Sequence, residues 1–239
     1  MNSNRKTAII VGVLFLTAIA VNALGDRLID SILNAPDYLT NFSANRTQVI
    51  TGVLLNLIGP AAVLGIAVLM FPILKKHNEP IALGYVGIRV IEGAIIVLYV
   101  ISPLLLITLS QEYVKAVAPD ASYFRTLGTL VIAWRDWTLP MLMMTSVGGL
   151  MFSYLLYQSK LIPRFISVLG LIAHPLVVTV ALLGMFGHID LPPLSGAGLI
   201  MILPTAAFEV VLLPIWLFVK GFNPSAIASG SAKTDINKV

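Results

Sequence analysis

The sequence has no cysteine and few charged residues. Its 239 residues include 15 Lys and Arg and 11 Asp and Glu, so that only 11% are charged. Soluble globular proteins carry about 25% charged residues. The lack of cysteine excludes disulfide frameworks, thiolate metal sites and cysteine nucleophiles. Because 58% of the residues are hydrophobic and the mean hydropathy is +0.94, the composition indicates an integral membrane protein.

The motifs that usually reveal an activity are also missing. There is no His-Glu-x-x-His zinc motif, no Gly-x-Ser-x-Gly elbow and no phosphate-binding glycine loop. No lysine lies deep in an apolar stretch, which excludes a retinal Schiff base, and a single deep histidine argues against a bis-histidine haem. We therefore expect no metal site and no cofactor.

Six apolar stretches are each long enough to cross about 30 Å of hydrocarbon as a helix. We predict an all-α integral membrane protein, a bundle of six transmembrane helices, with spans at Thr7–Leu24, Val49–Leu74, Ile81–Ser110, Leu127–Tyr157, Phe165–Gly187 and Gly198–Val219. The third and fourth stretches exceed one upright crossing, so we expect them to tilt or to project from the bilayer.

The distribution of basic residues predicts the orientation of this bundle. With the N-terminus in the cytoplasm, nine Lys and Arg lie in inner segments and four in outer ones, as the positive-inside rule requires. This asymmetry also explains the net charge of +4 without a nucleic-acid partner. We expect both termini in the cytoplasm of a bacterium, the chain in its inner (plasma) membrane, and membrane lipids as partners; the oligomeric state stays open.

Two segments outside the spans also carry predictions. Residues Asp26–Leu33 place apolar side chains at helical spacing and predict a short helix on the outer membrane surface, as an anchor or a lid. Residues 1–222 would form the transmembrane domain. The polar, small-residue-rich tail 223–239 is expected to be a disordered cytoplasmic segment.

Ionisable residues inside the spans are the candidate functional site. They are Arg89, Glu92, Arg135, Asp136, His174 and Glu209. At 1.5 Å per residue, all of them lie about 12–17 Å from a span end, close to the bilayer centre. One charge at that depth costs roughly 2.5–3.5 kcal/mol on insertion scales, so such residues usually pair away from lipid and often serve a function.

Spacing predicts how some of these residues interact. Arg89 and Glu92 are three residues apart and share a helix face, whereas the adjacent Arg135 and Asp136 point in different directions. We expect Tyr85, Asn56 and Thr205 to add hydrogen bonds to this set. His174 precedes a proline, which allows either a proton relay or a kink with a satisfied imidazole.

Several sequence blocks resemble one bacterial membrane family, the domain of unknown function 4386. They are Leu33-Asn-Ala-Pro-Asp-Tyr38, Phe71-Pro-Ile-Leu-Lys-Lys-His77, Gly84-Tyr-Val-Gly-Ile-Arg89, Ile101-Ser-Pro-Leu-Leu-Leu-Ile107 and Ser159-Lys-Leu-Ile-Pro-Arg-Phe165. The resemblance implies a bacterial polytopic membrane protein with one domain. It carries no catalytic residue or ligand across.

Three functional hypotheses remain open from sequence. The leading one is a transporter or sensor that binds a small polar or amphipathic molecule, with Arg89 and Arg135 holding an anionic group and the carboxylates balancing charge or carrying protons. The second is an intramembrane lipid-modifying enzyme with a carboxylate as general base. The third is a structural or partner-binding protein with no ligand, in which every charge would be paired.

Overall fold

The structure is a computed structural model that describes residues 3–115, 121–136, 139–189 and 197–229. Every element within these ranges is helical, as the sequence predicts. The elements are α1 (Ser3–Leu33), α2 (Tyr38–Ala44), α3 (Arg46–Leu74), α4 (Glu79–Lys115), α5 (Ala121–Asp136), α6 (Leu139–Ser159), α7 (Arg164–Met185), α8 (Ala197–Ala206), the π-helical segment η2 (Ala207–Leu212) and α9 (Leu213–Val219).

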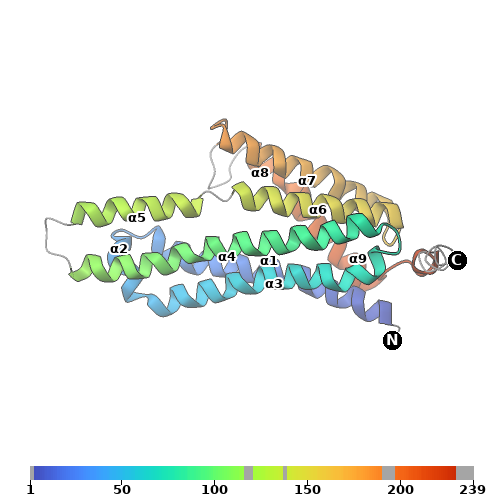
Figure 1. Cartoon of the computed structure of the whole chain (residues 1–239), viewed down its shortest axis with the longest axis horizontal. Coiled ribbons are helices and arrows are strands. Elements are labelled where there is room, and N and C mark those ends of the chain that lie inside the picture. The colour runs from blue at the N-terminus through green and yellow to red at the C-terminus, as the bar shows by residue number, and fades with distance from the viewer. Residues whose placement is uncertain (1–2, 116–120, 137–138, 190–196, 230–239) are drawn as a thin grey trace.

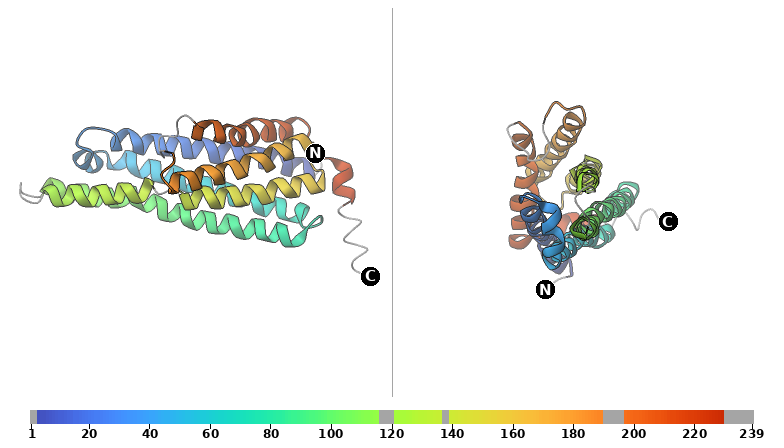
Figure 2. Two further views of the ribbon diagram at one scale, coloured as in Figure 1. Left: turned by 90° about the horizontal axis from the view of Figure 1, so that it is seen from above. Right: turned by 90° about the vertical axis from the view of Figure 1, so that its left-hand side faces the viewer.

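The long helices run side by side along the long axis of the molecule, and both ends of the chain lie at the same end of it (Figures 1 and 2). Helix α1 packs most extensively on α3, α3 on α4, and α6 on both α4 and α7. The last segment, α9, returns to α1 and closes the arrangement.

Five described helical segments are long and apolar enough to cross a membrane. They are Ser3–Leu33, Arg46–Leu74, Glu79–Lys115, Arg164–Met185 and Ile200–Val219. Exposed Leu, Ile and Val side chains along these segments would be costly in water but suit a lipid surround. These segments support a membrane-embedded helical protein.

The predicted surface helix over Asp26–Leu33 is wrong, because these residues continue α1 without a break. Partners on neighbouring helices explain the extension. The Asp26 carboxylate accepts hydrogen bonds from Asn56 Nδ2 at 2.9 Å and from the Tyr99 hydroxyl at 3.2 Å. The short helix of this region is instead α2, which Ser110 on α4 holds by accepting a hydrogen bond from the Ser43 backbone N–H at 2.8 Å.

The predicted fourth span, Leu127–Tyr157, is divided into two helices. Helix α5 ends at Asp136 and α6 begins at Leu139; residues 137–138 lie outside the described residues. Proline is favoured in the first turn of a helix and disfavoured in its interior, so Pro140 explains why a new helix starts here. Figure 1 shows the α4–α5 hairpin extending beyond the other helices, at the end opposite the termini.

The tail is ordered further than the sequence predicts. Residues 224–229 are helical, and the Asn223 backbone N–H donates to the Leu161 carbonyl at 2.9 Å. Phe222 and Ala226 are buried in the core, which holds this segment against the turn between α6 and α7. The expectation of disorder is therefore wrong for 223–229, and 230–239 lies outside the described residues.

Two hydrophobic clusters fill the bundle, one toward each end. The cluster near the termini includes Ala82 and Tyr85 of α4, and the other includes Ile96 and Val100 of the same helix. The stretch of α4 between them therefore crosses from one apolar core to the other. The candidate site lies at this level.

Candidate functional site at the level of Arg89

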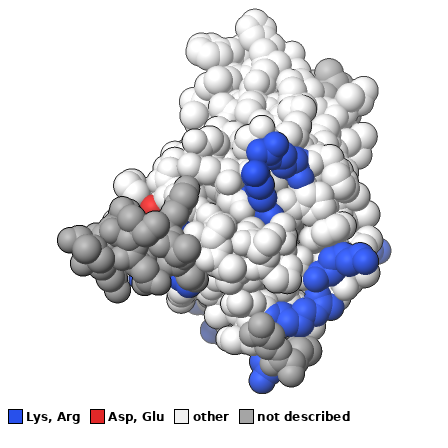
Figure 3. Space-filling model, turned by 90° about the vertical axis from the view of Figure 1, so that its right-hand side faces the viewer, with Lys and Arg blue, Asp and Glu red and all other residues white. Residues whose placement is uncertain are grey.

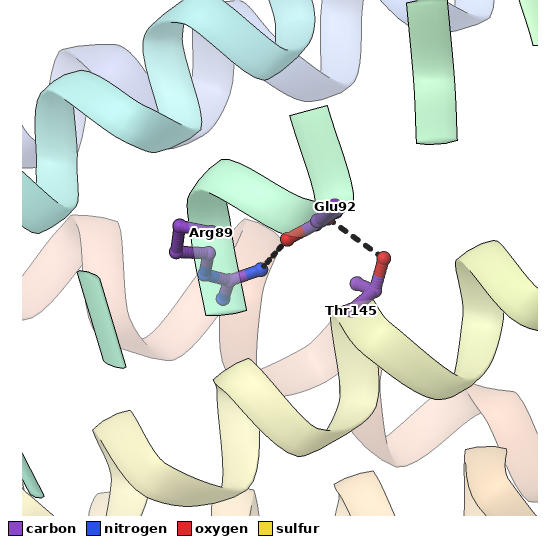
Figure 4. Close-up of polar contacts among 3 residues, drawn as sticks. All are labelled: Arg89, Glu92 and Thr145. Atoms are coloured by element: carbon purple, nitrogen blue, oxygen red, sulfur yellow. Dashed lines mark hydrogen bonds and ion pairs between the residues drawn. The ribbon is translucent and has the colours of Figure 1, made fainter. Parts of the chain in front are cut away.

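A buried ion pair on α4 is the centre of the site (Figure 4). Arg89 Nη1 lies 2.6 Å from Glu92 Oε2, and the two side chains are only 3% and 6% exposed. The other carboxylate oxygen, Glu92 Oε1, accepts a hydrogen bond from the Thr145 hydroxyl of α6 at 2.7 Å. The three-residue spacing thus gives the predicted pair, and α6 supplies a neutral donor that stabilises its negative member.

Aromatic rings cover the side of Arg89 that faces the termini. The guanidinium carbon lies 5.3 Å from the centre of the Tyr85 ring, within the range of a cation–π interaction. Tyr85 in turn stacks on Phe152 of α6, with ring centres 5.1 Å apart and planes at 18°. This stack fixes one wall of the site.

Two adjacent glycines allow α6 to approach the side chains of both Arg89 and His174. A Cβ on Gly148 would lie 3.1 Å from Arg89 Cζ, and a Cβ on Gly149 would overlap the His174 imidazole. His174 of α7 is 1% exposed, and its ring meets Phe208 of η2 edge-on at 5.8 Å. The absence of side chains at this glycine pair therefore makes room for Arg89 and His174 at the same level.

Glu209 enters the site from a π-helical turn. It lies in η2, one turn after the helix-interior Pro204, and it is half-buried. Its carboxylate is within electrostatic range of both Arg89 and Glu92, and His174 is within electrostatic range of Arg89. Single π-helical turns inside α-helices are frequent at functional sites, because the wider turn shifts a side chain away from its regular direction.

Several buried polar atoms on the helices that carry the site have no hydrogen-bond partner among the described residues. They include Arg89 Nε, His174 Nε2, Thr205 Oγ1 and the hydroxyls of Ser146, Ser153 and Ser167. A buried donor or acceptor left unsatisfied costs about 1–3 kcal/mol. Such atoms on α4, α6, α7 and α8 therefore indicate a place where water or a ligand supplies the missing partners.

The structure brings together four of the six predicted site residues: Arg89, Glu92, His174 and Glu209. Arg135 and Asp136 end helix α5, and their side chains lie outside the described part of the structure. Asn56 was expected beside this set, but it bonds Asp26 on α1 instead. The sequence does not point to Asp26 as a site residue, because its stretch is predicted to form a surface helix outside the membrane. It does not point to Thr145 or to the glycine pair either, because small neutral residues are not costly inside a membrane.

Asp26, Asn56 and Tyr99 form a second polar group, separate from the first. Tyr99 lies about 10 Å beyond Glu92 along α4 at 1.5 Å per residue, further from the termini. Within the described part of the chain, no group of three or more His, Asp or Glu side chains is arranged to hold a metal ion. The arrangement at Arg89 instead suits an anionic or hydrogen-bonding organic group.

Comparison with known proteins gives a family but no activity. No curated protein and no solved structure matches the chain. The family model described as "Domain of unknown function (DUF4386)" matches residues 10–221. This range includes every helix that carries the site, and it confirms the resemblance seen in the sequence blocks. The chain belongs to the DUF4386 family.

Proposed function

We propose that the chain is a six-span protein of the bacterial inner membrane with both termini in the cytoplasm. Five segments qualify as spans by length and composition, and termini at one end of the bundle (Figure 1) fit an even number of crossings. Helix α6, with 21 residues, reaches about 30 Å at 1.5 Å per residue and supplies the sixth. Lys and Arg gather on the face at the termini, where acidic atoms are scarce (Figure 3), which supports its cytoplasmic placement.

Within this protein, the site at Arg89 binds a small polar or amphipathic molecule that carries an anionic group, and the protein acts as a transporter or sensor. The observation that carries this proposal is the set of unpartnered buried polar atoms, above all Arg89 Nε and His174 Nε2. If the buried charges only held the helices together, we would expect every buried polar atom to have a partner. A buried polar atom without a partner destabilises the fold.

The residues have distinct roles in this proposal. Arg89 and His174 donate to the anionic group, while Glu92, held by Thr145, keeps Arg89 oriented. Glu209 balances the added charge or carries a proton, and the roles expected for Arg135 and Asp136 stay predictions from the sequence. Ligand entry would then displace water from the serine hydroxyls.

Native mass spectrometry of the detergent-purified protein tests this proposal with a matched pair of glycine variants. Gly149→Ala fills the space beside the His174 imidazole, whereas Gly87→Ala on α4 meets nothing within 4 Å. We expect a stoichiometric adduct on the wild type and on Gly87→Ala that is lost in Gly149→Ala and weakened in Glu209→Gln. A wild-type protein without an adduct would contradict a ligand at this site. So would an adduct that is retained by folded Gly149→Ala.

A further inference from the structure

A hollow lies at the end of the bundle that carries the termini, away from Arg89. It has a volume of about 560 Å³, and its rim includes Lys160, Arg164, Lys220 and Trp216. Ligand pockets in proteins typically measure about 300–1,000 Å³, so this hollow is large enough for a small polar group.

The hollow is strongly one-sided in charge. All three ionisable residues in its lining are cations, and none of the lining residues is acidic. A fourth cation, Arg5, contacts Gly221 in the wall, where an added Cβ would lie 2.9 Å from Arg5 Nη1. Lys and Arg on this face are visible in Figure 3. Cations gathered around one hollow repel one another unless an anion occupies it.

Hydrogen bonds between its two walls hold the hollow open in a fixed shape. One wall is the turn between α6 and α7, and the other is the segment that follows α9. The Asn223 backbone N–H donates to the Leu161 carbonyl at 2.9 Å, and its side-chain amide donates to the Lys160 carbonyl at 3.4 Å. The indole N–H of Trp216 donates to the Gly221 carbonyl at 3.1 Å. The floor is formed by buried Leu161, Ile162 and Phe222.

Apolar side chains beside the hollow decide which kind of anion it suits. Phe165, next to Arg164, is 63% exposed, and Ile215 and Val219, on α9 near Lys220, are 54% and 65% exposed. In a membrane protein these side chains face acyl chains. The lining also includes the half-buried Trp216, and tryptophan is typical of the headgroup level of a membrane. The hollow therefore offers cations for a phosphate and, directly beside them, a surface for its lipid tails.

We propose that this hollow is a binding site for the phosphate headgroup of an anionic phospholipid, with Lys160, Arg164 and Lys220 as its ligands. Basic hollows between transmembrane helices are suited to such headgroups. The bound lipid joins the α6–α7 turn to the segment after α9. The site is independent of the ligand proposed at Arg89.

The test compares lipid retention in two double variants with the same change of charge. Lys160→Gln/Lys220→Gln removes two cations of the hollow, whereas Lys6→Gln/Lys75→Gln removes two from the same end without touching its lining. Each cation that lies close to the bound phosphate contributes about fivefold to the affinity for an anionic lipid, and cations outside the hollow contribute much less. In native mass spectrometry with dimyristoyl phosphatidylglycerol, we expect an affinity loss of about thirtyfold for the first variant and of roughly twofold at most for the second.

Two further measurements distinguish the binding of an anionic lipid from the binding of other anions and from nonspecific lipid binding. Dimyristoyl phosphatidylcholine should be retained poorly by the wild type, and inorganic phosphate at the same concentration should neither raise the melting temperature nor compete with phosphatidylglycerol. Equal losses in the two double variants, equal retention of the two lipids, or competition by phosphate would each overturn the proposal. If the double variant fails to fold, Lys220→Gln alone should still lose about fivefold, and no loss there would overturn it.

Discussion

At the scale of single residues, the most unusual feature is an ion pair buried in an otherwise apolar bundle. Arg89 and Glu92 are almost completely inaccessible, and removing two charges from water costs several kcal/mol per ion before their attraction offsets it. A buried pair is therefore weak evidence of a stabilising role. The fold tolerates it because Thr145 and the Tyr85 ring also contact it.

Removing one charge of this pair should destabilise the protein more than removing both charges. Glu92→Gln leaves the Arg89 guanidinium buried and uncompensated, and we expect a loss of about 3 kcal/mol in unfolding free energy. The double variant Arg89→Met/Glu92→Leu replaces both charges by apolar side chains and should unfold within about 1 kcal/mol of the wild type. Unfolding in mixed detergent and SDS micelles measures both. A double variant less stable than Glu92→Gln would contradict this account and assign the pair a stabilising role.

The residues of the site differ in how far sequence predicts them. Arg89 and Glu92 follow from their spacing on one helix, and His174 and Glu209 follow from their depth in the spans. Gly148, Gly149 and Thr145 do not, because their importance comes from which face of α6 meets α4 and α7. A single sequence states which residues share a helix face but not which helix lies opposite that face.

At the scale of helices, α1 and α3 approach each other through glycine. A Cβ on Gly25 would lie 2.7 Å from the Gly52 carbonyl oxygen, and a Cβ on Gly52 would lie 2.9 Å from the Gly25 carbonyl oxygen. Small residues allow such close backbone approach in membranes, where helix association depends on packing rather than on the hydrophobic effect. This crossing also brings Asp26 within reach of Asn56.

Adding one methyl group at this crossing should separate the two helices. In Gly52→Ala, the new Cβ would lie 2.8 Å from Ile29 Cγ1 as well as against the Gly25 carbonyl, and we expect a destabilisation of about 2 kcal/mol. Gly65→Ala on the same helix is the control, because its nearest neighbour, Leu14 Cδ1, would lie at 3.4 Å. Thermal denaturation in detergent distinguishes the two. Equal melting temperatures would show that the α1–α3 contact yields without cost.

The end of α9 is capped by a side chain from the opposite end of the sequence. Arg5 Nη1 donates to the Leu217 carbonyl at 2.9 Å, and Nη2 donates to the Phe218 carbonyl. A cation at the C-terminal end of a helix satisfies orphan carbonyls and opposes the helix dipole. Arg5 thereby connects the first and last spans.

Removing this cap should loosen the closure between α1 and α9. We expect Arg5→Gln to lower the unfolding free energy by about 1–2 kcal/mol, whereas Lys6→Gln, whose side chain is exposed at the same end, should be neutral. Proteolysis of the C-terminal segment in detergent should accelerate in Arg5→Gln only. Equal cleavage rates in both variants would mean that the segment is held by other contacts, such as those of Phe222.

Element boundaries show where sequence reasoning fails and why. The stretch after Leu24 contains three charged residues before Leu33 and is predicted to be a separate surface helix, yet α1 continues through it because Asn56 and Tyr99 partner Asp26. The π-helical turn at Glu209 has no signature in composition or spacing. At Asp26 a contact from another helix decides the backbone, and such contacts are not encoded locally.

At the scale of the whole molecule, the polar site is a layer between two apolar cores. The core toward the termini holds the ends of α1 and α9 together, and the other core joins α2, α3 and α4. Charge in the middle of such a stack is least accessible from either membrane surface. A molecule bound at Arg89 would therefore have to pass one core or the other, which is the property that separates a transporter from a simple surface receptor.

The orientation of this stack in the membrane can be measured directly by cysteine labelling. Because the chain has no cysteine, any label on the protein must be on the introduced thiol. Ser225 lies in the helical segment 224–229, next to Asn223, which bonds the turn between α6 and α7. Ser122 is the second residue of α5, and α5 begins at the end of the bundle opposite the termini (Figure 1). Both side chains are exposed. With a membrane-impermeant maleimide on intact bacterial spheroplasts, we expect Ser122→Cys to react, and Ser225→Cys and Lys6→Cys to react only after permeabilisation. The reverse pattern would invert the orientation, since it would place the basic face outside against the positive-inside rule. Opposite behaviour of Lys6→Cys and Ser225→Cys would require an odd number of crossings, and α6 would then not span the membrane.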